Sequence, residues 1–186
     1  MIEKEHVLNV LKEVKKAVEN NDLIKLKDMS NQTLHSASIY QDADNIAIAV
    51  IIYVLSKILE RTKYRNYPNW PSFLSAFMHH IDKAVEYLEK DNLPLFEKEL
   101  KLIRKDVNHL SGGFKKDIQD VFQKASINKA SRIYEHGISI EKTSKLLGIS
   151  IFELAEYAGG TGVSEVDIGI SIPVKTRIKN ALEMFD

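Results

Sequence analysis

The stretch that decides the fold is residues 46–55, IAIAVIIYVL, ten apolar residues without a charge. A helix needs roughly 20 apolar residues to cross a bilayer, so this run is too short and predicts a segment buried in a protein core. Its β-branched residues are compatible with a strand, but the apolar pattern continues at Ile58 and Leu59 with helical spacing. We therefore expect a helix at the centre of the fold.

Helical periodicity recurs on both sides of this run, whereas strand alternation is nearly absent. Asn21-Asp22 supplies a stop for one helix and an N-cap for the next. Pro68 and Pro71 interrupt the pattern because proline does not fit inside a helix, although Pro71 suits the first turn of the helix that follows. We expect helices over residues 3–20, 23–40, a central helix ending near 62, and then 71–90, 93–110 and 114–136.

The diglycine Gly112-Gly113 is the strongest break in the chain. We interpret it as a domain boundary, with residues 1–111 forming a bundle of about five helices and residues 114–186 a second unit. In that unit, short capped helices extend to about residue 158, and a final amphipathic helix begins at Pro173. The sequence thus predicts an all-α protein, an N-terminal helical bundle followed by a C-terminal helix-turn-helix unit.

Composition narrows the function classes. The chain has 26 basic and 26 acidic residues, so no whole-protein field draws it to nucleic acid or to an anionic membrane, and such binding would need a local patch. The absence of cysteine excludes disulfides, thiolate chemistry and cysteine-bound zinc. The charged N-terminus lacks the pattern of a signal peptide. We expect a cytoplasmic protein without a membrane partner.

Residues 126–158 carry the cap and turn signals of a helix-turn-helix. Gly137 suits a helix end and Gly148 a tight turn. Ser150 and Glu153 then form a capping box, S-x-x-E, at the start of the last helix of the unit. These signals favour a helix-turn-helix over an unrelated pair of short helices.

The charges on this unit do not favour base reading. Residues 125–160 hold four basic and four acidic residues, and the last helix offers no Arg, Lys, Asn or Gln to contact base edges. Candidate contacts to a DNA backbone are Lys142 and Lys145. An apolar and acidic face fits a groove on a protein partner better. The candidate partner-binding residues on that face are Ile151, Phe152, Glu153 and Glu156.

This segment resembles the helix-turn-helix of small prokaryotic antitoxin-like proteins over about 35 of the 186 residues. The resemblance implies a nuclease toxin as partner and a role in transcriptional regulation, and the last helix of that family also contains a glutamate. The loop here is one residue shorter, and the usual small pair is Thr143-Ser144. The matching residues are Ala130, Ile133, Tyr134, Gly137, Ile138, Ser139, Leu147, Gly148, Ile149, Ser150, Glu153 and Leu154.

One segment, RTKYRNYPNW, combines basic and aromatic residues. Aromatic rings stack on unpaired bases while cations hold phosphates, which makes the segment a candidate nucleic-acid surface. The alternative is that the same residues anchor a long loop onto the bundle. The candidate residues are Arg61, Lys63, Tyr64, Arg65 and Trp70.

Arg104 and His109 have the Arg-x4-His spacing of the HEPN ribonucleases, helical bundles that this chain resembles in size. The resemblance implies an arginine and a histidine acting on an RNA 2'-hydroxyl and phosphate, usually across a dimer interface. On one helix, residues five apart do not share a face. Catalysis by Arg104 and His109 is therefore the alternative hypothesis.

The sequence favours a non-catalytic regulatory or interaction protein with a protein partner, a nuclease toxin or a second copy of itself. DNA binding and a homodimer remain open alternatives. We expect no metal and no cofactor, because adjacent histidines such as His79-His80 point about 100° apart on a helix and the chain has no phosphate-binding glycine loop.

Overall fold

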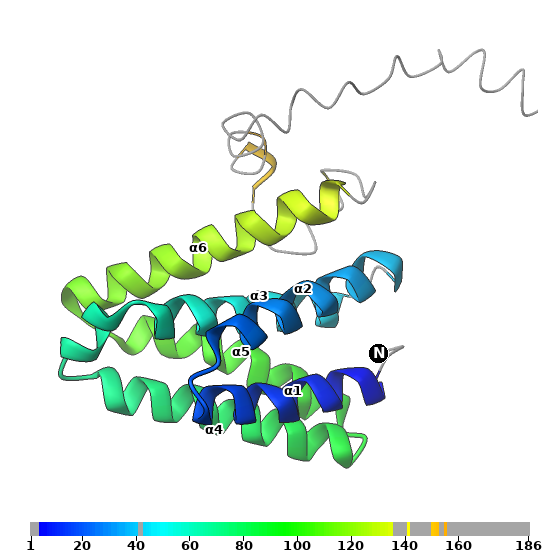
Figure 1. Ribbon diagram of the computed structural model, residues 1–186, viewed down its shortest axis with the longest axis horizontal. Coiled ribbons are helices and arrows are strands. Elements are labelled where there is room, and N and C mark those ends of the chain that lie inside the picture. Colours follow the sequence, from blue (N-terminus) through cyan, green and yellow to red (C-terminus); the bar gives the residue numbers. More distant parts are fainter. Residues whose placement is uncertain (1–3, 41–42, 136–140, 142–149, 153–154, 156–186) are drawn as a thin grey trace, which may run out of the picture.

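The computed structural model describes residues 4–40 and 43–135, together with residues 141, 150–152 and 155. Within these residues every regular element is helical, and the predicted all-α class is confirmed (Figure 1). The elements are α1 (Lys4–Glu19), α2 (Leu23–Tyr40), α3 (Ala43–Glu60), the 3-10 helix η1 (Thr62–Asn66), α4 (Trp70–Glu89), α5 (Leu93–His109) and α6 (Gly112–Glu135).

The apolar run of residues 46–55 forms the middle of α3, which is the central helix of the bundle. Within the run only Ala47 and Tyr53 keep partial exposure, and the other eight side chains are buried. Helix α3 packs against α2, α5 and α6, while α1 packs against α2 and α4. Figure 1 shows α6 along one side of α2 and α3, with α1 and α4 on the other side. No helix in the described part of the chain is long and apolar enough to span a membrane.

The helix ends follow the local signals of the sequence. The Asp22 side chain accepts a hydrogen bond from the backbone N–H of Lys25 at 3.0 Å, which confirms the predicted cap of α2. Asn92 caps α5 in the same way, at 3.2 Å from the N–H of Leu95. Asn21 and Asp91, at the preceding turns, have left-handed backbones with φ of 52° and 56°, a conformation that Asn and Asp tolerate.

An aromatic cluster around Phe114 fixes the start of α6 against η1 and α4. The Phe114 ring stacks on Tyr67 with 4.7 Å between centroids and meets Phe73 edge-on at 5.5 Å. Gly113 makes the approach possible, because a Cβ there would lie 3.3 Å from the Tyr67 hydroxyl oxygen. Gly112 adopts a φ of +57°, so the diglycine allows the sharp turn that opens α6.

The first helix after the diglycine packs onto the bundle. Helix α6 contacts α3, α5 and α2, and its buried face includes Ile118, Phe122 and Ile133. Most of the remaining residues of the predicted second domain, and the helix expected from Pro173, lie outside the described residues. The division of the chain at residue 111 therefore stays a prediction.

The buried position of α3 predicts a large cost for shortening one of its side chains. Leu55 is fully buried, so Leu55→Ala should lower the free energy of unfolding by about 2–5 kcal/mol, through lost burial and the cavity left behind. Urea unfolding followed by circular dichroism measures the change. Ile24→Ala, at a residue that is 75% exposed, is the control and should change stability by less than about 0.5 kcal/mol. Equal effects of the two substitutions would contradict the central position of α3.

Candidate functional site

The predicted helix-turn-helix is described at only a few positions. Of its candidate residues, Lys142, Lys145, Glu153 and Glu156 lie outside the described residues. Ile151 and Phe152 are described, and both are exposed, by 43% and 85%. These two side chains are therefore accessible to a partner, whereas the architecture of the unit around them stays a prediction.

Exposed large apolar side chains are rare in the described part of the chain. Besides Ile151 and Phe152 they are Ile24 and Ile39, both on α2. Phe152 is the most exposed of the four, and it is adjacent to Ile151. Isolated apolar residues are common on any protein surface. An adjacent pair of exposed apolar residues is more typical of a contact surface.

The basic and aromatic segment divides between core and surface. The Tyr64 ring is fully buried and Trp70 is 7% exposed, and both pack near Phe114. Neither ring offers a face to an unpaired base, so for these two residues the loop-anchoring alternative replaces base stacking. The three cations of the segment stay at the surface. Arg61 donates a hydrogen bond to the Tyr64 hydroxyl at 2.7 Å, and Arg65 is exposed. Lys63 pairs with Asp117 at 3.3 Å.

Arg104 and His109 both lie on α5 but are not brought to one pocket in the described structure. Five residues separate them by about 140° around the helix and about 7.5 Å along it. Arg104 lines a cavity of about 190 Å³ between α5 and α3 with Leu100 and Ile51, and it donates a hydrogen bond to Ser126 at 3.3 Å. Part of Arg104 is exposed, and partial burial lowers the pKa of its guanidinium. His109 is exposed at the end of α5.

The structure reveals a site that the sequence analysis missed, where α6 passes α2 and α3. Lys129 of α6 is fully buried, and its Nζ lies 4.3 Å from the centroid of the Tyr53 ring. The same Nζ donates a hydrogen bond to Oδ1 of Asn31 at 2.9 Å, and Nη1 of Arg132 donates to that oxygen at 3.3 Å. Two cations from α6 therefore share one neutral acceptor on α2.

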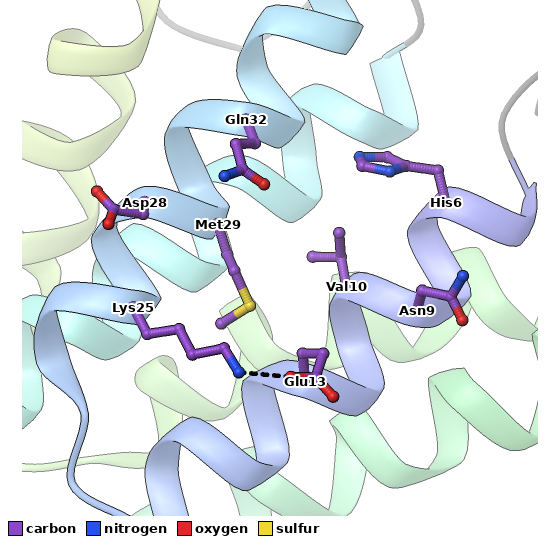
Figure 2. Close-up of a pocket in the computed structure, with 8 residues that line it drawn as sticks. All are labelled: His6, Asn9, Val10, Glu13, Lys25, Asp28, Met29 and Gln32. Atoms are coloured by element: carbon purple, nitrogen blue, oxygen red, sulfur yellow. Dashed lines mark hydrogen bonds and ion pairs between the residues drawn. The ribbon is translucent and has the colours of Figure 1, made fainter.

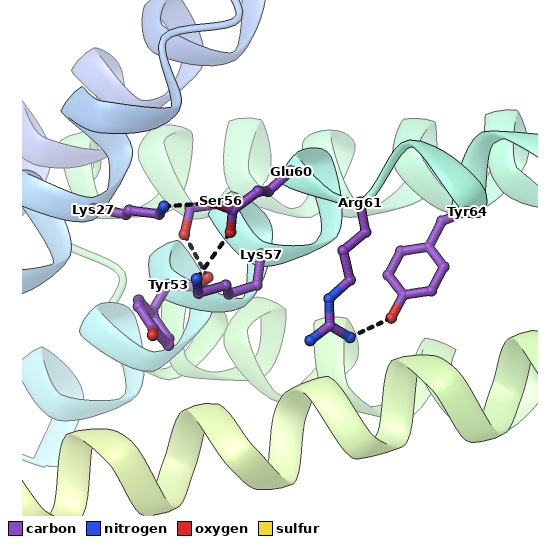
Figure 3. Close-up of polar contacts among 7 residues, drawn as sticks. All are labelled: Lys27, Tyr53, Ser56, Lys57, Glu60, Arg61 and Tyr64. Carbon is purple, nitrogen blue, oxygen red and sulfur yellow. Dashed lines mark hydrogen bonds and ion pairs between the residues drawn. The ribbon is translucent and has the colours of Figure 1, made fainter.

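A second pair of cations adjoins this site from α2 and α3. The Lys57 Nζ lies 5.5 Å from the centroid of the Tyr53 ring, and both Lys57 and Lys27 pair with Glu60, at 2.9 and 2.8 Å. Figure 3 shows Lys27, Tyr53, Lys57 and Glu60 grouped where α6 runs past α3. We name the connected residues the basic network; they are Lys27, Asn31, Tyr53, Lys57, Glu60, Lys129 and Arg132.

Two groups of the basic network have shifted pKa values, Lys129 through burial and Glu60 through hydrogen bonds. Removal from water, together with a smaller effect of the nearby charge of Arg132, lowers the pKa of Lys129 to about 7. Hydrogen bonds from Lys27 and Lys57 lower the pKa of Glu60 to about 2, so this carboxylate is ionised at neutral pH. Burial therefore disfavours the positive charge of Lys129, while the two lysine partners stabilise the negative charge of Glu60.

The sequence does contain a signal for the buried lysine. Ile118, Phe122, Ala125 and Ile133 are buried on one stripe of α6, and Lys129 occupies the position between the last two at helical spacing. A lysine at a core position of an amphipathic stripe marks a candidate buried cation. Its partners Asn31 and Tyr53 carry no comparable signal.

A cleft between α1 and α2 is a second site that the sequence did not indicate. Its volume is about 380 Å³, and Val10 and Met29 are its buried apolar side chains. Figure 2 shows the residues of α1 facing those of α2, with the ion pair of Glu13 and Lys25 at 2.5 Å across one end. The Nε2 atom of His6 is buried and has no hydrogen-bond partner among the described residues. The remaining lining residues are Asn9, Asp28 and Gln32.

Both ring nitrogens of His80 contact acidic side chains. Its Nδ1 lies 2.6 Å from Glu99 and its Nε2 lies 3.0 Å from Asp106, so each ring nitrogen faces a carboxylate. Both bonds can be donated together only by the protonated ring. His80 therefore joins α4 to α5 through contacts with two residues of α5.

Comparison with protein-family models, with curated proteins and with solved structures finds no match to this chain. The resemblances of residues 126–160 to antitoxin-like proteins and of Arg104 and His109 to HEPN ribonucleases therefore stay predictions.

The lowered pKa of Lys129 predicts a specific pH dependence of stability. Between about pH 7 and the ordinary lysine value of 10.5, the unfolded chain binds the proton that the folded chain has released. The free energy of unfolding contributed by Lys129 therefore rises with pH in this interval, by at most about 1.4 kcal/mol per pH unit.

Urea unfolding of the wild type and Lys129→Met at pH 6, 7, 8 and 9 measures this contribution. The wild type should gain stability relative to the variant from pH 7 to pH 9, and the difference should change little from pH 6 to pH 7. Lys124→Met is the control, since Lys124 is an exposed lysine on the same helix, and this variant should follow the wild type across the series. A constant difference between wild type and Lys129→Met across the series would show that Lys129 titrates as an ordinary lysine.

The ribonuclease alternative has its own test. If Arg104 and His109 act on RNA, the purified chain cleaves a labelled RNA, and Arg104→Ala or His109→Ala abolishes the cleavage. Cleavage that persists in both variants, or no cleavage by the wild type, would remove these residues from consideration as catalytic. Lys101→Ala is the matched control, because Lys101 lines the same cavity as Arg104 and is not part of the Arg-x4-His pair.

Proposed function

We propose that this chain is a non-catalytic regulatory or interaction protein that binds a protein partner through Ile151 and Phe152. In this proposal the helical bundle is the scaffold, and a helix-turn-helix that begins within α6, at about residue 126, presents the contact. The observation that carries it is the exposure of Phe152, 85%, next to the exposed Ile151. Aromatic residues dominate the binding energy of many protein interfaces, which makes Phe152 the anchor of the contact.

The chemistry of the surrounding sequence supports a protein over a DNA duplex. The segment SIFELAEYAG has two glutamates and no side chain suited to base edges, so phosphates would repel it. The resemblance of residues 126–160 to antitoxin-like proteins suggests a nuclease toxin as the class of partner. DNA contact through Lys142 and Lys145, and pairing with a second copy of the chain, are the competing interpretations.

The experiment is affinity capture with the tagged full chain from extracts of its source cells, with and without nuclease. We expect a protein that is retained after nuclease treatment and is lost with Phe152→Asp or Ile151→Asp. Ile24→Asp is the matched control, since Ile24 is an apolar residue on α2 whose exposure, 75%, lies between those of Ile151 and Phe152, and this variant should keep the partner. Each variant is checked for an unchanged unfolding midpoint.

The outcomes separate the interpretations. Loss of the captured protein on nuclease treatment, together with salt-dependent binding of duplex DNA that Lys142→Gln and Lys145→Gln weaken, would favour the DNA interpretation. Self-association of the purified chain that Phe152→Asp disrupts would identify the partner as a second copy. Retention of the partner by Phe152→Asp and Ile151→Asp would exclude this pair as the contact.

A further inference from the structure

We propose that the basic network on α2, α3 and α6 is a binding site for phosphate groups, and that its ligand is the sugar-phosphate chain of a nucleic acid. The site is independent of Ile151 and Phe152, and it is built entirely from residues of the bundle.

The charge balance of the network is strongly positive although the whole chain is neutral. Four basic side chains stand against the single carboxylate of Glu60, which gives a net charge of +3 when Lys129 is protonated. Glu60 already receives both Lys27 and Lys57, at 2.8 and 2.9 Å. The positive charge of Lys129 and Arg132 is therefore not balanced by any carboxylate in the network, and an anion would balance it.

The geometry at Asn31 leaves donors available. Lys129 and Arg132 both donate to the one Oδ1 atom of Asn31, at 2.9 and 3.3 Å. A guanidinium has five N–H donors and an ammonium has three, so one shared amide oxygen uses a small part of this capacity. Arg132 is exposed and Asn31 is half-buried, so the approach to this corner is open on the Arg132 side. A phosphate oxygen there would accept from Arg132 in the bidentate manner that guanidinium favours.

Lys129 lies behind this corner and acts through its charge. It is fully buried against the Tyr53 ring, so it does not need to touch the ligand. In a medium of low polarity its charge acts on a nearby anion more strongly than a surface lysine would. Burial lowers the pKa of Lys129. A phosphate bound beside Arg132 would raise that pKa.

Further cations lie beyond Lys57, at the end of α3 and on η1. Arg61 follows α3 directly, and Figure 3 shows the Lys57 and Arg61 side chains beside α6. Lys63 and Arg65 on η1 are also exposed, and Lys63 pairs with Asp117 at 3.3 Å. A single phosphate ion needs only the corner at Asn31, whereas several neighbouring cations fit successive phosphates of one strand. This extension favours a nucleic-acid chain over a free phosphate.

The test uses the purified full chain and a fluorescein-labelled single-stranded RNA of mixed sequence, about 15 nucleotides long. Binding is measured by fluorescence anisotropy in a series from about 50 to 200 mM NaCl. Binding should weaken linearly with the logarithm of salt concentration. Lys57→Gln with Arg132→Gln should lower affinity by about tenfold or more and reduce the slope by about 1.4, since each lost phosphate contact removes about 0.7 for a single strand.

Two controls separate charge at this site from charge elsewhere. Lys90→Gln removes an exposed lysine that pairs with Glu86 at 2.7 Å on α4, as Lys57 pairs with Glu60, and it should leave binding unchanged. The charge-preserving pair Lys57→Arg with Arg132→Lys should keep the salt slope. Equal unfolding midpoints of the variants show that a loss of affinity is not a loss of fold.

The free-phosphate source is tested in the same preparation with inorganic phosphate and with sodium chloride at matched ionic strength. If RNA does not bind but phosphate raises the melting temperature of the wild type and not of the Lys57→Gln, Arg132→Gln variant, the phosphate site stands and the nucleic-acid source is wrong. If neither probe binds, or if RNA binds equally well to wild type and variant, the proposal is overturned. None of these results bears on the partner proposed for Phe152, because no other protein is present.

Discussion

The need to bury α3 on all sides constrains the rest of the bundle. A helix that is apolar around nearly its whole circumference cannot lie at a surface, because each exposed face would cost the free energy of hydrating apolar groups. Helices α2, α5 and α6 therefore surround α3, and α1 and α4 complete the bundle beyond α2 and α5. Ser30 of α2 marks how close this packing is, since its hydroxyl donates to the carbonyl oxygen of Ala49 on α3 at 2.7 Å. Burial of α3 requires α6 to pack against it, and this packing places Lys129 of α6 beside α2 and α3.

The charges of a neutral chain are distributed unequally over this scaffold. Helix α1 pairs its lysines with acidic residues of α4, as in Lys12 with Glu89 at 2.6 Å and Lys15 with Asp82 at 3.0 Å. Such exposed pairs contribute little to stability, but they neutralise that face. On the side of α6, Lys129 and Arg132 donate to the neutral Asn31, while Lys57 pairs with Glu60. Net charge over the whole chain therefore does not describe the local balance of charge.

The sequence predicted the helices well because their signals are local. Asp22 caps a helix three residues away and Pro71 lies in the first turn of the helix that follows it, so each signal acts within a few residues of where it stands. Tyr64 and Trp70 were harder to place, because the orientation of their rings depends on Phe114, about 50 residues further along the chain. The burial of Lys129 was missed because a lysine is ordinarily expected to be exposed. The cleft between α1 and α2 depends on which faces of these two helices lie against each other. The cleft and the partners of Lys129 are tertiary relations that no motif in the sequence records, although the place of Lys129 on the apolar stripe of α6 is itself a local signal.

Helices α6 and α3 should form one cooperative unit, since the basic network exists only while α6 is held on α3. Native-state hydrogen exchange measures this cooperativity, because exchange at each amide reports the free energy of the opening that exposes it. We predict that the slowest amides of α6 and of α3 exchange with the same free energy, equal to that of global unfolding. Exchange of α6 through a separate opening of much lower free energy, with α3 still protected, would contradict the account.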